Sequence, residues 1–270
     1  MTPSPPQGGS LGTGFDAMVT AGGIPKPGES LYEFSQGKSK ALIEVAGKPM
    51  VQWVLDALSA AKSIGRVVIV GLEESSGMKC GVPLAYIPNQ GGMLENIRAG
   101  ARKIAELNPK VEFALIVSSD IPTITAVMVD WACAQVRPGQ DDAVYNVIKR
   151  DVMEKRFPNS RRTFTKLKGM EVCGGDMNPA SVPLILSHTG PWEKIAAARK
   201  SPVRQASLIG FDTLLLFLLR ALTLEQAAAR VSKRLGLRAR GVVCPYPELG
   251  MDVDKLHHLE IVRRDLGGKA

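Results

Sequence analysis

The sequence predicts an α/β fold in which a mostly parallel sheet carries helices on both of its faces. Strand and helix patterns alternate through the first half of the 270-residue chain, and this alternation is typical of parallel sheets with helical crossovers. Two predicted strands, residues 67–70 and 113–117, are apolar throughout, as strands buried on both faces should be. The expected arrangement has three layers and is Rossmann-like.

The individual elements follow from periodicity and from turn residues. Leu94, Ile97, Ala101 and Ile104 recur at the helical period and predict a helix. Pro49 opens an earlier helix. The predicted strands cover residues 15–20, 41–46, 67–70, 84–87, 113–117 and 142–146. The predicted helices of this half cover residues 50–63, 93–107 and 126–135.

Residues 149–168 interrupt the alternation with a surplus of lysine and arginine and with no regular period, so part of this stretch is expected to be a loop. Thr223 and Gln226 have the spacing of a capping box at the start of a later helix. The elements expected after the basic stretch are helices over 191–200, 210–220 and 223–235, a strand over 239–244 and a helix over 255–264. We therefore expect a flexible tail over 1–14, rich in Pro, Gly and Ser, and one domain over 15–270 with a basic, helical insertion at about 149–236.

Composition limits the classes of partner. A net charge of +8 favours anionic ligands without separating nucleotides from nucleic acid, but an aromatic content of only 5% disfavours nucleic-acid stacking. Four cysteines without a CxxC spacing indicate reduced thiols and a cytoplasmic protein. The most apolar stretch, residues 214–219, is too short to span a bilayer, so no membrane partner is expected.

A glycine loop follows the first strand. Ala21, Gly22 and Gly23 can turn the backbone sharply and present amide groups to a polyanion. Lys26 and Lys40 follow as candidate counter-charges for phosphates. A plain tight turn with solvated lysines is an equally good interpretation of these residues alone. The GxxxxGK[ST] and GxGxxG motifs are absent, which disfavours a P-loop enzyme and a dinucleotide-binding domain.

Three aspartates follow two of the predicted strands. Asp120 comes after residues 113–117, at the sheet edge where open α/β proteins bind ligands. Asp252 and Asp254 follow residues 239–244 in the same way. Carboxylates at such an edge can hold Mg²⁺, and each could instead cap the helix that follows. Because one helix needs only one cap, we expect a Mg²⁺ site that uses Asp120 and Asp254, with Asp252 beside them.

These segments together resemble the MobA-like nucleotidyltransferases. The matching residues, in the order and rough spacing of that family, are 21–23, 38–42, 47–49, 119–122 and 252–254. The resemblance covers residues 15–146 and the C-terminal aspartate motif. It implies a mixed sheet of the nucleotide-diphospho-sugar transferase type. It also implies Mg²⁺-dependent transfer of a nucleoside monophosphate from an NTP to a phosphorylated acceptor, a sugar phosphate or a cofactor phosphate.

The resemblance also assigns roles to residues. Asp120 and Asp254 would bind the metal, Lys40 would stabilise phosphate charge, and Lys26 stands in the loop where the family usually has an arginine. The nucleotide-binding positions would be Ala21, Gly22 and Gly23, with Asn89, Gly92 and Asn96 in the base-recognition segment 89–96. The attacking phosphate is already an anion, so no general base is required. His188, His257 and His258 are expected to be surface or helix residues.

The residues that would bind the second substrate are less clearly indicated by the sequence. Lys166 and Lys168 could reach its phosphate while Gly175 lets it approach the backbone; a solvated loop with a turn is the favoured alternative. A non-catalytic nucleotide-binding regulatory module of the same fold is the competing function, and nucleic-acid binding is the least favoured one. The oligomeric state, a homo-oligomer included, stays open.

Overall fold

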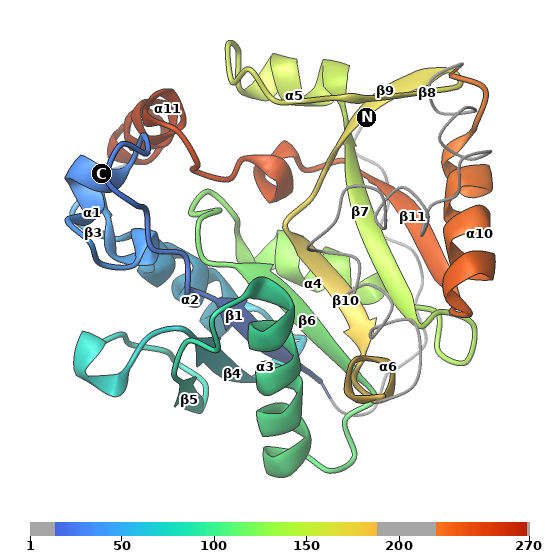
Figure 1. The fold of residues 1–270 in the computed structure, drawn as a ribbon, viewed down its shortest axis with the longest axis horizontal. Coiled ribbons are helices and arrows are strands. Elements are labelled where there is room, and N and C mark those ends of the chain that lie inside the picture. The colour runs from blue at the N-terminus through green and yellow to red at the C-terminus, as the bar shows by residue number, and fades with distance from the viewer. Residues whose placement is uncertain (1–13, 188–219, 269–270) are drawn as a thin grey trace.

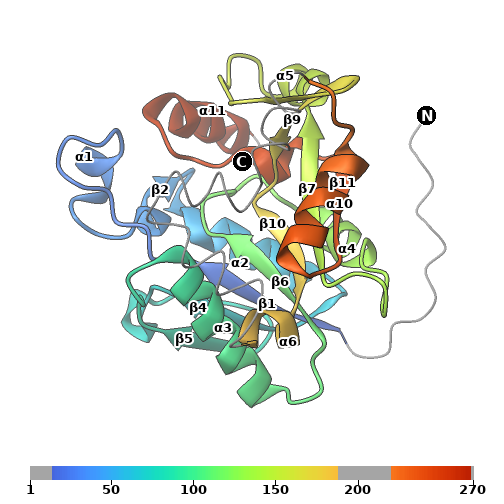
Figure 2. The same ribbon diagram turned by 45° about the vertical axis from the view of Figure 1, so that its right-hand side comes forward.

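The computed structural model describes residues 14–187 and 220–268, and within them nine strands form one mixed sheet (Figures 1 and 2). The spatial order is β5-β4-β1-β6-β10-β7-β9-β8, and β11 pairs with β7. The strand bounds are β1 Phe15–Thr20, β4 Ile64–Val70, β5 Leu84–Ile87, β6 Phe113–Ser118, β7 Ala143–Lys149, β8 Thr165–Leu167, β9 Met170–Gly174, β10 Met177–Ser181 and β11 Ala239–Cys244. The predicted α/β class is confirmed.

The parallel part of the sheet positions the site. Strands β4 and β6 both pair with β1 in parallel, and β5 extends this group beyond β4. Strand β10 runs antiparallel between β6 and β7. The strands β1, β4, β5 and β6 therefore all end at one edge of the sheet, where the loops that follow them gather.

Helices cover both faces, as Figure 1 shows. Helices α2 (Met50–Ala60) and α4 (Ala126–Ala134) pack against each other on one face, and α3 (Met93–Leu107) and α6 (Val182–Leu186) do so on the other. Strand β1 contributes to both cores, because Met18 packs with the α3 side while Val19 packs with the α2 side. Both side chains are fully buried. The three expected layers are present.

The segment predicted as a strand over 41–46 is different in the structure. It forms the 3₁₀ helix η1 (Lys40–Leu42) and the two-residue strand β2 (Glu44–Val45), which pairs with β3 (Lys48–Pro49). The Ser39 side chain caps η1 by accepting from the backbone N–H of Ala41. This local hydrogen bond competes successfully with an extended backbone.

The basic stretch, residues 149–168, has regular secondary structure in two short parts. It contains the short helix α5 (Arg150–Arg156) and strand β8, with an irregular segment between them, so the expectation of a partial loop is confirmed. Strands β8, β9 and β10 are not among the predicted elements. The predicted helices over 191–200 and most of 210–220, like residues 1–13 of the predicted tail, lie outside the described residues. The division into a tail and a single domain stays a prediction.

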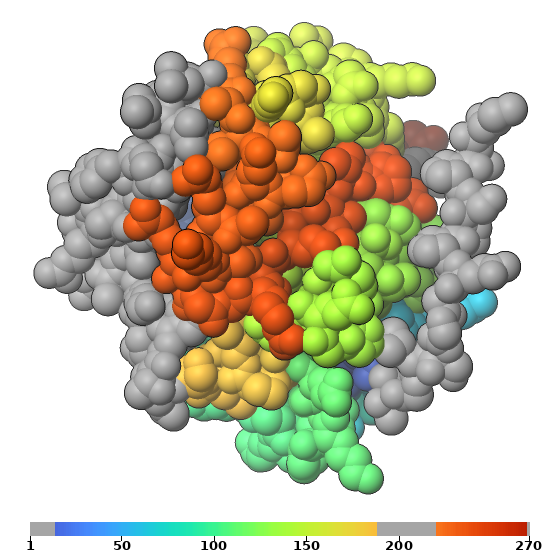
Figure 3. All heavy atoms as spheres, turned by 90° about the vertical axis from the view of Figure 1, so that its right-hand side faces the viewer, coloured from blue at the N-terminus to red at the C-terminus, as the bar shows by residue number. Residues whose placement is uncertain are grey.

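The C-terminal part of the chain adds strand β11 to β7 and covers it with a helix. Helix α10 (Leu224–Leu235) begins with the predicted capping box between Thr223 and Gln226, and it packs on β11. Figure 3 shows α10 and β11 side by side on this face. Helix η3 (Pro247–Gly250) and helix α11 (Leu256–Gly267) follow β11. Two further small helices, α1 (Tyr32–Ser35) and η2 (Glu74–Ser76), belong to the loops after β1 and β4. Among the described residues, no helix has the length and apolarity needed to cross a membrane.

Candidate active site

Three aspartates from distant parts of the chain meet at the sheet edge. Asp120 follows β6, and Asp252 and Asp254 follow η3. The two loops are joined by a backbone hydrogen bond of 2.9 Å, which the N–H of Val253 donates to the carbonyl of Asp120. One carboxylate oxygen from each aspartate lies within 4.8 Å of the other two. The structure thus brings together the three residues that the sequence analysis assigned to a metal.

Lys40 connects these carboxylates with the glycine loop. Its Nζ lies 2.5 Å from Oδ2 of Asp120 and 2.5 Å from Oδ1 of Asp254. Its backbone N–H donates to the carbonyl of Gly23 over 2.8 Å. Although burial opposes the charged form, the Asp120 and Asp254 carboxylates raise the pKa of Lys40 above its ordinary value. Lys26 lies on the same loop with an exposed side chain.

The glycine loop is shaped by the segment that begins at Asn89. Asn89 donates from Nδ2 to the carbonyl of Gly22 over 3.0 Å, and Asn96 donates to Oδ1 of Asn89 over 3.1 Å. A Cβ atom on Gly22 would lie 2.7 Å from Nδ2 of Asn96 and 2.8 Å from Oδ1 of Asn89. A larger residue at this position would therefore displace the side chains of Asn89 and Asn96. Ala21 is buried and accepts from the Ser39 hydroxyl, and Gly92 starts helix α3.

The chain matches a known family. The family model of the MobA-like NTP transferase domain matches residues 33–241. The chain belongs to this family. A hypothetical transferase from Thermus thermophilus is 32% identical, with a TM-score of 0.77 over 92% of this chain and 100% of that chain. No curated protein gives a significant match.

Two further solved structures share the fold at low identity. One is a CMP:2-keto-3-deoxy-manno-octonic acid synthetase complexed with CTP, 14% identical with a TM-score of 0.59 over 96% of this chain and 100% of that chain. The other is a 4-diphosphocytidyl-2C-methyl-D-erythritol synthase from Anaerococcus prevotii, 14% identical with a TM-score of 0.58 over 94% and 98%. The protein is therefore a nucleotidyltransferase of the MobA-like family, with the mixed sheet that the sequence predicted.

A fourth carboxylate enters this nucleotidyltransferase site. Asp176 is held by its backbone, which donates to the carbonyl of Leu249 and accepts from the N–H of Ser118. Burial and the neighbouring charges of Asp252 and Asp120 raise the pKa of Asp176 to about 8. The sequence analysis considered Gly175 but gave Asp176 no role. The sequence feature that could have indicated Asp176 is the pair Gly174 and Gly175 followed by an aspartate at the end of a strand.

The aspartates differ in how readily they ionise. Burial raises the pKa of Asp252 to about 6. Burial acts in the same direction on Asp254, but hydrogen bonds from Asp252 and Lys40 outweigh it and lower its pKa to about 2. Asp176 is largely protonated at neutral pH, so the carboxylates of Asp120, Asp252 and Asp254 face two cations, Lys40 and Arg162. This deficit of positive charge is what a divalent cation would neutralise.

Two residues that the sequence analysis left without a role support the aspartates. Arg162 forms an ion pair with Asp252. His258 is buried, donates from Nε2 to the carbonyl of Ser160 over 2.9 Å, and accepts from the N–H of Asp254 at Nδ1 over 3.4 Å. Burial and the neighbouring His257 lower the pKa of His258 to about 4. His258 is thus a helix residue but not a surface one, because it ties two loops of the site together.

Lys166 and Gly175 have different surroundings. Lys166 lines a cavity of about 620 Å³ between α5, β8 and the loop that carries Arg161 and Arg162. Its Nζ lies 3.7 Å from Oε1 of Glu171. Gly175 is buried, and a Cβ atom there would lie 3.1 Å from the backbone oxygen of Asn146. Arg162 lines this cavity and also pairs with Asp252, so this side chain connects the cavity with the aspartates.

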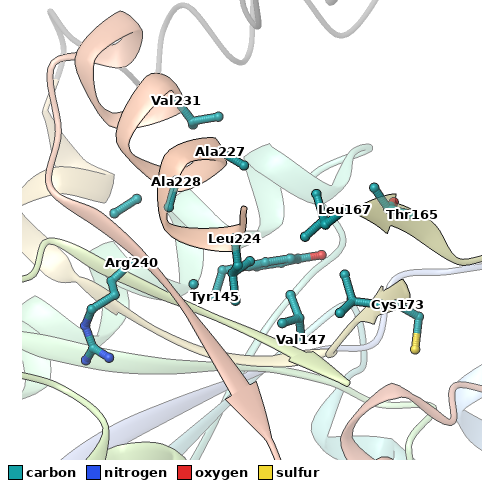
Figure 4. Close-up of a pocket in the computed structure, with 14 residues that line it drawn as sticks. Tyr145, Val147, Thr165, Leu167, Cys173, Leu224, Ala227, Ala228, Val231 and Arg240 are labelled. Atoms are coloured by element: carbon teal, nitrogen blue, oxygen red, sulfur yellow. The ribbon is translucent and has the colours of Figure 1, made fainter. Parts of the chain in front are cut away.

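A second pocket, of about 310 Å³, lies between α10 and strands β7, β9 and β11 (Figure 4). Tyr145, Leu224 and Val147 point into it in Figure 4, and no carboxylate is among its lining residues. The guanidinium of Arg240 is held by Asp141. This apolar pocket offers nothing to a metal–phosphate complex.

Proposed function

We propose that this nucleotidyltransferase uses Mg²⁺ to transfer a nucleoside monophosphate from an NTP to a phosphorylated small-molecule acceptor, with release of pyrophosphate. The observation that carries the proposal is the position of Lys40. Its ammonium group lies between Asp120 and Asp254, and the carbons of its side chain lie beside Gly23. Phosphate-binding amides and metal-binding carboxylates thus share one small space.

The donor set fits Mg²⁺. Asp120 and Asp254, with Asp252 beside them, offer oxygen ligands, which Mg²⁺ prefers together with phosphate oxygens. Their oxygens lie within 4.8 Å of one another, whereas two ligands of one Mg²⁺ stand about 3.0 Å apart when adjacent and about 4.2 Å apart when opposite, so binding would draw the carboxylates together. Bound there, Mg²⁺ would neutralise charge on the triphosphate during transfer.

The chain's own residues would bind and orient the NTP. The N–H of Ala21 donates to the carbonyl of Val70, so the amides of Gly22 and Gly23 would contact the phosphate oxygens while Ala21 holds the start of the loop. Asn89, Gly92 and Asn96 belong to the segment that would contact the base. Lys40 and Lys26 would stabilise the negative charge of the departing pyrophosphate. Catalysis of this kind depends mainly on position and on charge neutralisation.

The transfer needs no base from the protein. An oxygen of the acceptor's phosphate, already an anion, attacks the α-phosphorus while the bond to the β-phosphate oxygen breaks and pyrophosphate leaves. His258 fits this scheme, because both of its ring nitrogens are engaged with backbone groups. Lys166, Lys168 and Gly175 are proposed to serve the acceptor's phosphate. Unpaired cysteines and the use of an NTP favour the cytoplasm.

The test is a screen followed by an assay. Melting temperatures with each of four NTPs and Mg²⁺ identify the preferred base, because a ligand of the folded state raises the melting temperature. Pyrophosphate release is then measured with a panel of sugar phosphates and cofactor phosphates. Asp120→Asn should reduce the rate at least about a hundredfold, whereas the surface variant Glu106→Gln should not. Tight NTP binding without turnover on any acceptor would instead favour the non-catalytic regulatory module.

A further inference from the structure

Arg162 stands between two parts of the molecule that the fold brings together. On one side its guanidinium pairs with the Asp252 carboxylate, and its Nη1 lies 3.5 Å from the backbone oxygen of the same residue. On the other side it lines the cavity of about 620 Å³. The Nε of Arg162 is buried and has no hydrogen-bond partner within the described part of the chain. One donor of this guanidinium is therefore unused.

The cavity next to Arg162 has the charge of an anion site. Arg150, Arg161, Arg162 and Lys166 line it together with only two carboxylates, Glu154 and Glu171. Those two carboxylates are paired with Arg150. Arg161 is exposed, and its backbone has a φ of 52°, a strained conformation for arginine that points to a constrained loop.

Arg162 and a divalent cation would compete for Asp252. Arg162 compensates the charge of this carboxylate in the structure, as Lys40 does for Asp120 and Asp254. A cation bound among the aspartates repels both side chains and supplies the positive charge that they now provide. A guanidinium released from Asp252 has the cavity beside it, and its planar fork suits two phosphate oxygens.

We infer that Arg162 is an exchangeable cation: it pairs with Asp252 in the metal-free protein and, once a divalent cation takes that carboxylate, binds the anionic group of the acceptor in the adjacent cavity. This inference rests on the proposed function for the identity of the acceptor as a phosphorylated molecule. It assigns Arg162 to acceptor binding and couples the metal to the acceptor. By linkage, each of the two then strengthens the binding of the other.

The first experiment titrates the protein with Mn²⁺, an oxygen-seeking substitute for Mg²⁺ that is visible by electron paramagnetic resonance. Arg162→Met should bind Mn²⁺ about tenfold more tightly than the wild type, because a competing charge is gone. A merely structural arginine would give the opposite sign, since a misplaced Asp252 would weaken Mn²⁺ binding. Arg161→Met lines the same cavity without pairing with Asp252 and should leave Mn²⁺ affinity unchanged.

The second experiment measures the binding of inorganic phosphate by calorimetry with and without Mn²⁺. In the Mn²⁺-loaded protein, Arg162→Met should lose about tenfold in phosphate affinity. Without metal the variant should match the wild type, because there Arg162 is held by Asp252. An equal loss in both states, or no loss in the loaded state, would overturn the inference.

Two further measurements keep the outcome interpretable. Arg162→Lys keeps the charge without the fork and should fall between wild type and Arg162→Met in both titrations; circular dichroism melts establish that each variant is folded. Neither titration contains an NTP. If pyrophosphate release fails while the metal–phosphate coupling holds, the proposed function fails alone. If release succeeds and the coupling is missing, only the role of Arg162 fails.

Discussion

Lys40 donates from Nζ to Oδ1 of Asp254 over 2.5 Å, although the two residues are 214 positions apart in the chain. The contact joins the loop after β1 to the loop before α11. Because the same ammonium group also reaches Asp120, the phosphate-binding and metal-binding parts of the site depend on one side chain. That dependence can be tested directly.

Replacing Lys40 should impair the chemical step. Lys40→Met should lower the rate of pyrophosphate release by about a hundredfold to a thousandfold, because a cation poised for developing phosphate charge is lost. Lys40→Arg should not restore the rate, since a planar guanidinium cannot replace a compact ammonium between two carboxylates. Steady-state kinetics with the preferred NTP measure both. The exposed neighbour Lys38→Met is the control, and an equal loss there would contradict the specific role of Lys40.

A methyl group on Gly22 should disturb nucleotide binding. Gly22→Ala places its Cβ against Asn89 and Asn96 at 2.7–2.8 Å, which is closer than real Cβ contacts allow. We expect at least about a tenfold loss of NTP affinity, since the added methyl group displaces the Asn89 and Asn96 side chains that hold the amide loop. Fluorescence titration with a labelled NTP measures it. Gly267→Ala, where the added methyl meets nothing, should bind as the wild type does. Unchanged NTP affinity in Gly22→Ala would remove the loop from the site.

The metal-free protein should lose stability as pH rises. The pKa of Asp176 is raised from 3.8 to about 8 by burial and by the charges of Asp252 and Asp120. The native state therefore holds this proton more tightly than the unfolded state, and the free energy of unfolding decreases between about pH 4 and about pH 8. Asp176→Asn removes this effect and should melt at a higher temperature than the wild type near pH 8. Thermal melts of both proteins across this pH range, in the presence of a chelator, measure the difference. If the melting temperatures of the wild type and Asp176→Asn change with pH in parallel, the prediction is refuted.

An ion-pair cluster should stabilise the β7–β11 side of the sheet. Asp141 is buried, and the side chains of Arg240 and Arg137 with the backbone N–H of Arg137 outweigh that burial and lower its pKa to about 2. Because this pKa is depressed, its contribution to stability is present above about pH 4 and is lost as pH falls toward about 2. At neutral pH Asp141→Asn should cost about 2 kcal/mol of unfolding free energy in urea.

The neighbouring residue supplies the comparison. Asp142 pairs with Arg238 at the surface, so Asp142→Asn should cost about 1 kcal/mol or less. Equal costs for the two variants would show that burial does not distinguish these ion pairs.

The sequence predicted the parallel half of the protein because that half repeats simple signals. The apolar runs that became parts of β4 and β6 contribute buried side chains to both faces of the sheet, and the ends of parallel strands share one edge. This is why the meeting of Asp120 with Asp254 could be expected from positions far apart in the chain. The 3₁₀ turn at Lys40–Leu42 could not, because a single hydroxyl, that of Ser39, decides it.

The antiparallel half of the sheet could not be predicted from the sequence, for a different reason. Strands β9 and β10 are short and are separated by Gly175 and Asp176, which resemble an ordinary turn. Asp176 acquires its role only because its backbone bonds to Leu249 and Ser118. The roles of Arg162 and His258 likewise depend on contacts across about ninety residues of sequence, which no local pattern contains.

The most direct test of the account is an anomalous difference map from crystals grown with Mn²⁺ and a non-hydrolysable analogue of the preferred NTP. The account predicts one Mn²⁺ peak at about 2.2 Å from carboxylate oxygens of Asp120, Asp252 and Asp254, with the ammonium of Lys40 moved onto the phosphates and the triphosphate against Gly22 and Gly23. A triphosphate bound elsewhere, or a map in which Lys40 still bridges Asp120 and Asp254 without a metal, would contradict it.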